Sequence, residues 1–228
     1  MVILEQSKTI MEFKNCNILD QNISLPEFSF LIEENDVVEI ESLDDEKSSL
    51  FIRGLATLAP LRGEIMFKGS LYDPLDYENL LKLKRQIGYL GPLCSLLSNR
   101  SILENIFLFK MWEENLKKIK LDESFMNEFK QAGILEYIYK RPEKTTEEIK
   151  CGTYLVREFL KKPGIVFLER PYLFTRGKLS RFLCNNLKDS SQKKVPIVFF
   201  SNTGFVPATE VTHKIIVEND KIEKIKVE

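Results

Sequence analysis

The sequence predicts an α/β fold with a mostly parallel core sheet, an N-terminal antiparallel β part and a helical subdomain. Two short apolar runs, 164–168 and 195–200, contain no charged residue, a pattern typical of strands buried on both faces of a parallel sheet. A helical pattern at 178–187 lies between the two runs. A strand, a helix and a second strand of this kind form a right-handed βαβ unit.

The composition is that of a single globular domain. Of 228 residues, 43% are hydrophobic and 29% are charged, which suffices for a real core. The 33 Lys and Arg residues nearly balance 34 Asp and Glu residues, so no overall positive field attracts nucleic acid, and we expect no such partner. Cys16, Cys94, Cys151 and Cys184 form no CxxC pair, which predicts reduced thiols rather than disulfides or a zinc site.

The chain shows no segment that would place it in a membrane by itself. Its longest apolar stretches are much shorter than the roughly 20 residues that a spanning helix needs. Residues 1–10 are too polar for the apolar part of a signal peptide. We therefore expect a cytoplasmic chain that other subunits would have to hold at a membrane.

Strand patterns dominate the beginning of the chain. They predict a small antiparallel sheet leading into a core strand, with strands at 11–16, 28–32 and 37–40 and a break at Pro26. The next predicted elements, in chain order, are a helix at 47–58, a strand and turn at 64–69, a short helix at 76–83 and a strand at 86–90.

The middle of the chain is predicted to be mainly helical. A largely helical region at 103–138 has helix-start residues at Ser101 and Asp122 and a stop at Gly133, and a further helix follows at 147–161.

The tail at 214–225 predicts a hairpin that turns at Asn219 and Asp220. We expect one domain with three parts: an antiparallel β part at 1–36, a core at 37–91 and 160–228, and a helical subdomain at 92–159.

Four segments carry a family resemblance through their order and spacing. They are 58–69 (LAPLRGEIMFKG), 85–90 (RQIGYL), 101–106 (SILENI) and 163–171 (PGIVFLERP). In this order they resemble the nucleotide-binding subunits of ABC transporters, whose strand after the phosphate-loop helix, entry into the helical subdomain and Walker B strand they match. The resemblance implies an ABC-ATPase-type P-loop fold with a RecA-like core.

The phosphate loop is altered at the positions that matter most for binding. The motif G-x-x-x-x-G-K-[ST] needs glycines so that backbone N–H groups can converge on phosphate oxygens at a helix N-terminus. In the matching window, Glu41 and Glu46 replace both glycines, while Lys47, Ser48 and Ser49 remain as a remnant of Walker A. Triphosphate binding in the usual pose is therefore not expected.

A second interpretation of this window needs no ligand. Lys47 and Ser48 would merely open a surface helix, with Asp44, Asp45 and Glu46 favourably placed near its N-terminus.

The other positions implied by the resemblance have changed as well. The glutamine that orients magnesium and the attacking water aligns with Pro92, which has no side-chain amide. The Walker B aspartate and the catalytic glutamate align with Glu169 and Arg170, and a guanidinium cannot accept a proton from water. The switch histidine aligns with Asn202, and the signature Leu-Ser-Gly-Gly-Gln with 145–149, TTEEI.

Three residues have simpler interpretations. We expect Glu169 and Arg170 to form a structural ion pair or a dimer contact rather than a new acid–base site. The single histidine, His213, lies outside all of these motifs and is predicted to be a surface residue.

These changes indicate a degenerate nucleotide-binding subunit, a pseudo-ATPase that acts as a structural or regulatory component of a membrane transport complex. No cofactor is expected. The alternative is an atypical but active subunit that energises transport in a heterodimer and binds ATP and magnesium. Either chain would sit on the inner face of the plasma membrane.

The expected partners are membrane permease subunits, and a second ABC ATPase subunit or another copy of this chain. The resemblance implies a groove that receives coupling helices of the permease. It would involve Leu93, Leu96, Leu97, Ile102, Ile106, Phe107, Phe109 and Trp112.

Overall fold

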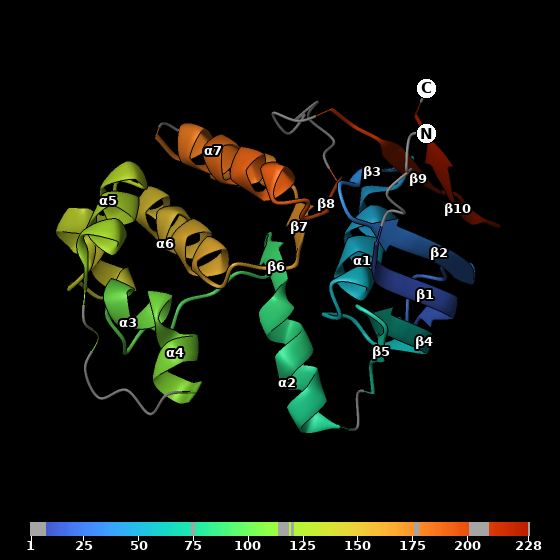
Figure 1. Ribbon diagram of the computed structural model, residues 1–228, viewed down its shortest axis with the longest axis horizontal. Coiled ribbons are helices and arrows are strands. Elements are labelled where there is room, and N and C mark those ends of the chain that lie inside the picture. The colour runs from blue at the N-terminus through green and yellow to red at the C-terminus, as the bar shows by residue number, and fades with distance from the viewer. Residues whose placement is uncertain are drawn as a thin grey trace, which may run out of the picture.

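Two sheets form the framework of the molecule (Figure 1), which the computed structural model describes over residues 8–73, 76–113, 119, 121–175, 178–200 and 210–227. The larger sheet has the strand order β10-β9-β3-β8-β7-β6, and every pairing from β9 to β6 is parallel. Its strands are β3 (Val37–Glu41), β6 (Ile87–Leu90), β7 (Ile165–Glu169), β8 (Ile197–Phe200), β9 (His213–Val217) and β10 (Ile222–Lys226).

Burial of the central strands explains their uninterrupted apolar sequences. All residues of β6, β7 and β8 are buried, because helices cover one face of the sheet, and helix α1 with the second sheet behind it covers the other. The parallel strands predicted at 164–168 and 195–200 are thereby confirmed. At the opposite edge, β9 and β10 pair antiparallel and turn at Asn219 and Asp220, so the predicted C-terminal hairpin is also present.

The smaller sheet is antiparallel, as predicted for the beginning of the chain, and has the order β2-β1-β4-β5. Its strands are β1 (Thr9–Ile18), β2 (Phe28–Glu33), β4 (Leu61–Phe67) and β5 (Ser70–Leu71). The expected strand at 64–69 thus begins earlier and pairs with β1.

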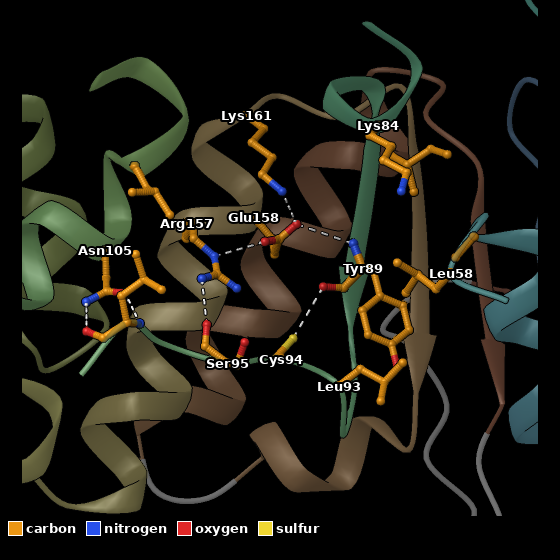
Figure 2. A pocket seen from close by; sticks show the side chains of 14 residues that line it. Leu58, Lys84, Tyr89, Leu93, Cys94, Ser95, Asn105, Arg157, Glu158 and Lys161 are labelled. Atoms are coloured by element: carbon orange, nitrogen blue, oxygen red, sulfur yellow. Dashed lines mark hydrogen bonds and ion pairs between the residues drawn. The ribbon is translucent and has the colours of Figure 1, made fainter. Parts of the chain in front are cut away.

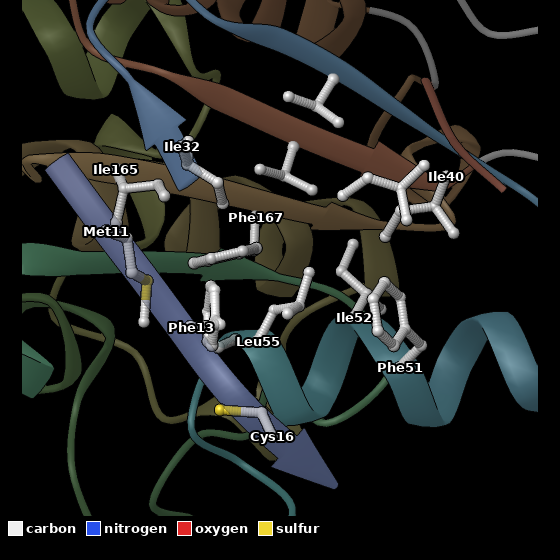
Figure 3. Close-up of a cluster of buried hydrophobic side chains, with 14 of the residues drawn as sticks. Met11, Phe13, Cys16, Ile32, Ile40, Phe51, Ile52, Leu55, Ile165 and Phe167 are labelled. Carbon is white, nitrogen blue, oxygen red and sulfur yellow. The ribbon is translucent and has the colours of Figure 1, made fainter. Parts of the chain in front are cut away.

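Helix α1 (Asp45–Leu55) lies between the two sheets (Figure 3). Phe51, Ile52 and Leu55 are fully buried in the cluster that also contains Phe13 of β1 and Phe167 of β7. The interpretation of this segment as a surface helix is therefore wrong. Its apolar residues recur at helical spacing and fill the space between two apolar sheet faces.

The other helices gather on the far face of the core sheet or beside it (Figure 1). They are α2 (Tyr77–Gln86), α3 (Ile102–Ile106), α4 (Leu108–Glu113), α5 (Glu123–Gln131), α6 (Glu147–Leu160) and α7 (Lys178–Gln192), with short 3-10 helices η1 (Leu135–Tyr137), η2 (Pro142–Lys144) and η3 (Pro171–Phe174). None of the described helices is both long and apolar enough to cross a membrane.

The predicted helical region at 103–138 is divided into short helices. Ser101 caps α3 in a capping box with Glu104, and Asp122 caps α5. Gly133 follows α5 with a φ of 73°, where glycine is unstrained. The helix starts predicted at Ser101 and Asp122 and the stop predicted at Gly133 are confirmed. The domain boundaries drawn from the sequence stay a prediction.

Candidate functional site

The loop between β3 and α1 is closed by one of its own side chains. Asp44 has an extended backbone and forms the N-cap of α1. Its Oδ1 accepts hydrogen bonds from the backbone N–H groups of Glu46 (2.9 Å) and Lys47 (3.2 Å). These are N–H groups of the kind that a helix N-terminus offers to a phosphate. A carboxylate of the chain itself already satisfies them.

The three remnant residues of the phosphate loop lie in different environments. Lys47 Nζ donates a 2.5 Å hydrogen bond to Asn219 Oδ1 in the β9–β10 turn. Ser48 and Ser49 are buried, and within the described residues their hydroxyl groups have no hydrogen-bond partner. The structure therefore ties the lysine to the C-terminal hairpin and places both serines in the interior.

Glu169, at the end of β7, is completely buried and bound on both oxygens. Arg53 of α1 donates from Nε to Oε2 (2.8 Å) and from Nη2 to Oε1 (2.6 Å), and Tyr89 of β6 donates its hydroxyl to Oε2 (2.5 Å). Hydrogen bonding to Glu169 raises the pKa of Arg53, and burial together with the same carboxylate raises the pKa of Tyr89. A carboxylate engaged in this way is a poor ligand for magnesium.

Gly91 makes room for this cluster. A Cβ atom at this position would collide with the Tyr89 hydroxyl group and lie 2.8 Å from Glu169 Cβ. The adjacent Pro92 is exposed. Its ring provides no hydrogen-bonding group in place of the glutamine that the resemblance implies.

Arg170 does not pair with Glu169, so the expected ion pair between these neighbours is wrong. Glu169 pairs with Arg53 instead. Arg170 has a left-handed backbone (φ 52°, ψ 58°), and its Nε is buried without a partner among the described residues. The backbone N–H of Arg170 donates to the carbonyl of Phe200 (3.0 Å), so the turn after β7 is attached to β8. Asn202 lies outside the described residues.

Comparisons with known proteins extend over nearly the whole chain. No family model matches the sequence. The chain is 21% identical over 217 residues to a phosphonates import ATP-binding protein PhnC of Lactobacillus delbrueckii subsp. bulgaricus, covering 91% of this chain and 85% of the relative. It is 22% identical over 172 residues to PhnC 3 of Halalkalibacterium halodurans, covering 71% and 67%.

Solved structures share the fold. The dimeric ATP-binding cassette MJ0796 with bound ADP and phosphate superposes with a TM-score of 0.76 at 16% identity, over 95% of this chain and 98% of that one. An ABC transporter ATP-binding subunit superposes with a TM-score of 0.77 at 17% identity, over 96% and 90%.

The chain is similar in sequence to ATP-binding subunits of ABC transporters and has the fold of ATP-binding cassettes.

In this cassette the segment aligned with the signature motif opens helix α6. Thr146 is the N-cap of α6 and accepts a hydrogen bond from the N–H of Ile149 (3.5 Å). Glu147 follows and is paired with Lys150 (2.6 Å), with 74% of its side chain exposed. A carboxylate therefore stands where the resemblance implies a glycine.

A cavity of about 350 Å³ lies beside the segment that follows β6 (Figure 2). Leu93 and Leu97 line it with 50% and 46% of their surface exposed, and a neighbouring groove reaches Phe109. Ile102, Ile106 and Phe107 belong to the interior instead, so their predicted place in the groove is wrong. The side chains of these three residues pack α3 and the residue that follows it against the buried apolar cluster.

The remaining predicted groove residues are divided. Leu96 is partly buried and packs against the buried apolar cluster between the core sheet and helices α3, α6 and α7. The side chain of Trp112 lies outside the described part of the structure.

The cavity also contains a buried charge cluster that the sequence did not predict. Glu158 accepts from Arg157 Nε (3.1 Å) and from Lys161 Nζ (2.6 Å), while Arg157 also donates from Nη1 to the carbonyl of Ser95 (2.9 Å). A signal was present in the sequence, because Glu158 lies on the buried face of α6 among apolar residues. The sequence around Arg53 gives the same signal, because this charged residue directly follows the apolar Phe51 and Ile52 on α1.

Proposed function

We propose that the chain is a degenerate nucleotide-binding subunit that neither binds nor hydrolyses ATP and serves as a structural or regulatory component of a membrane transport complex. The observation that carries this proposal is the Asp44 carboxylate on the N–H groups of Glu46 and Lys47. A phosphate would have to displace it from the same donors.

The charge around this loop supports the proposal. Asp44, Asp45 and Glu46 lie together at the start of α1. At an effective dielectric constant near 20, two like charges about 4 Å apart repel by about 4 kcal/mol before screening by salt. A triphosphate would meet several such charges, and the single Lys47 offsets only part of the repulsion.

The chemistry at the other positions supports loss of hydrolysis. Glu169 is held by Arg53 and Tyr89, so it is not available to orient a hydrated magnesium ion. Arg170 stands where a general base is needed, and a guanidinium offers no acceptor for a proton from water. Neither magnesium nor a nucleotide in the usual pose fits these residues.

The proposed partners are membrane permease subunits. PhnC proteins, to which the chain is similar, are import ATP-binding proteins, so we infer an import complex at the inner face of the plasma membrane. The exposed Leu93 and Leu97 beside the cavity are the surface that we expect to receive a permease segment.

One observation favours the alternative, an active subunit in a heterodimer. Lys47 and Ser48 are retained, and the Ser48 hydroxyl is buried without a partner in the described part of the chain. In that case ATP and magnesium would bind after Lys47 leaves Asn219 and the Asp44 cap opens.

Thermal unfolding with and without Mg-ATP separates the two possibilities. A ligand present at 100 times its Kd stabilises a protein by about 2.7 kcal/mol, which raises the melting temperature of a chain of this size by roughly 5–10 °C. We expect a shift below about 1 °C at millimolar Mg-ATP for the native chain. A shift of several degrees that disappears in Lys47→Ala would support the active subunit.

A further inference from the structure

We propose that Arg53 is a built-in counter-ion that fixes the end of β7 against α1 and β6, and thereby holds the segment 91–97 in place without any bound ligand. The inference rests on the proposed function, because it treats Glu169 as a residue that never receives a metal. It adds a permanent positioning role for a residue on the helix that follows the phosphate loop.

The Arg53–Glu169 pair is built as an interior contact. Two hydrogen bonds of 2.8 and 2.6 Å make it bidentate, the geometry in which an arginine and a carboxylate hold each other most rigidly. Glu169 has no exposed surface, and 29% of the Arg53 side chain is exposed. The guanidinium therefore supplies the positive charge that a buried carboxylate requires.

Tyr89 joins β6 to the same carboxylate. Its hydroxyl donates to Glu169 Oε2, the oxygen that also accepts from Arg53 Nε. The absence of a side chain at Gly91 lets the phenol ring reach this position. Three elements, α1, β6 and β7, consequently meet at one buried carboxyl group.

The other end of the segment 91–97 is held from α6 (Figure 2). Arg157 donates to the carbonyl of Ser95 (2.9 Å), and Glu158 accepts from the Tyr89 N–H at a longer distance of 3.4 Å. Within the segment, the N–H of Leu97 and the carbonyl of Leu97 both bond to the side chain of Asn105.

The segment that carries the exposed Leu93 and Leu97 is thus attached to Glu169 on one side and to α6 and α3 on the other. The first attachment depends on Arg53, since Tyr89 would otherwise donate to an unbalanced buried charge. A change at Arg53 should therefore be detected at residues 89–97, on a different element.

Hydrogen exchange of the ligand-free protein tests this positioning role. Arg53→Met should lower the melting temperature by roughly 10 °C, because Glu169 loses its partner. It should also raise the exchange rates of the amides in 89–97 roughly tenfold. Lys193→Met, which breaks an exposed ion pair with Asp189, is the matched control and should change neither quantity.

Two further variants separate positioning from simple stabilisation. Arg53→Met combined with Glu169→Met removes both charges, so it should recover most of the melting temperature while exchange in 89–97 stays fast. Tyr89→Phe keeps the ion pair and should also speed exchange there, which decides the matter if Arg53→Met does not fold.

Unchanged exchange in 89–97 in Tyr89→Phe and in the double variant would overturn the proposal and leave the ion pair a local contact. These measurements contain no nucleotide. Binding of Mg-ATP by the native chain would be evidence against the proposed function. The exchange rates measured without nucleotide would still test the positioning role of Arg53.

Discussion

In the proposed function, two side chains of the chain take up groups that a nucleotide would otherwise use. Asp44 brings a negative charge to the helix N-terminus, and Arg53 brings a positive charge to Glu169. The sequence predicted the loss of glycine at Glu41 and Glu46. It could not predict the pairing of Arg53 with Glu169, because the partners are 116 positions apart and meet only after α1 packs on β7.

The Asp44 cap should contribute measurably to stability. Asp44→Ala removes the acceptor for two N–H groups, which typically costs about 1 kcal/mol, or roughly 2–4 °C in melting temperature for a chain of this size. Asp44→Asn is the matched control, because asparagine caps helices about as well. Equal melting temperatures for Asp44→Ala and the native chain would show that the cap is unimportant.

Arg170→Glu alone should not restore ATP hydrolysis. The new carboxylate would occupy the position of the general base, while Pro92 still lacks an amide and Glu169 stays bound to Arg53. Phosphate release should remain at the background of the native chain. Turnover that disappears when Lys47→Ala is added would show that the rest of the site is functional.

At the scale of elements, the C-terminal hairpin is attached to the core by a cluster of charges around Asp36. His213 Nδ1 lies 3.1 Å from Asp36 Oδ1 and 3.0 Å from Thr212 Oγ1, and Lys224 Nζ bonds to Asp36 Oδ2 (2.5 Å). His213 is half-buried, so its predicted place on the surface is wrong. The hairpin itself was predictable from local sequence, whereas this contact joins the hairpin to Asp36, which lies 188 positions before Lys224.

The cluster predicts a pH dependence of stability. Burial lowers the pKa of His213. The positive charges of Lys224 and Lys226 lower this pKa further, and the negative charges of Asp36 and Glu33 oppose the shift. A lowered pKa means that the unfolded chain binds more protons, so the free energy of unfolding should fall as the pH drops from about 7 to 5. His213→Gln should flatten melting temperature against pH in this range. An unchanged slope would exclude His213 as its source.

For the whole molecule, the chain has the fold of ATP-binding cassettes, and the two segments aligned with the phosphate loop and the signature motif carry acidic residues in the first turns of α1 and α6. The order of strands and helices was predictable, because each buried strand and each capped helix leaves a local pattern. The site was predictable only as a set of losses. Its new contacts, from Arg53, Tyr89 and Glu158, depend on packing between elements.

This distribution of charge predicts how the cassette assembles with an active ATPase. Glu147 and Glu148 at the start of α6 would face the γ-phosphate bound by a partner, and repulsion opposes closure. A crosslinker that joins a cysteine placed at position 146 or 147 to an amine should therefore fail to reach the Walker A lysine of a partner during turnover. Efficient crosslinking, with a changed ATPase rate in Glu147→Gly, would contradict this.

Isothermal titration of the native chain with Mg-ATP measures directly whether this chain binds the nucleotide. We expect heats that equal those of dilution up to millimolar nucleotide, because Asp44 occupies the N–H groups of the loop and Arg53 occupies Glu169. A saturable isotherm with a stoichiometry near one, abolished by Lys47→Ala, would contradict the account.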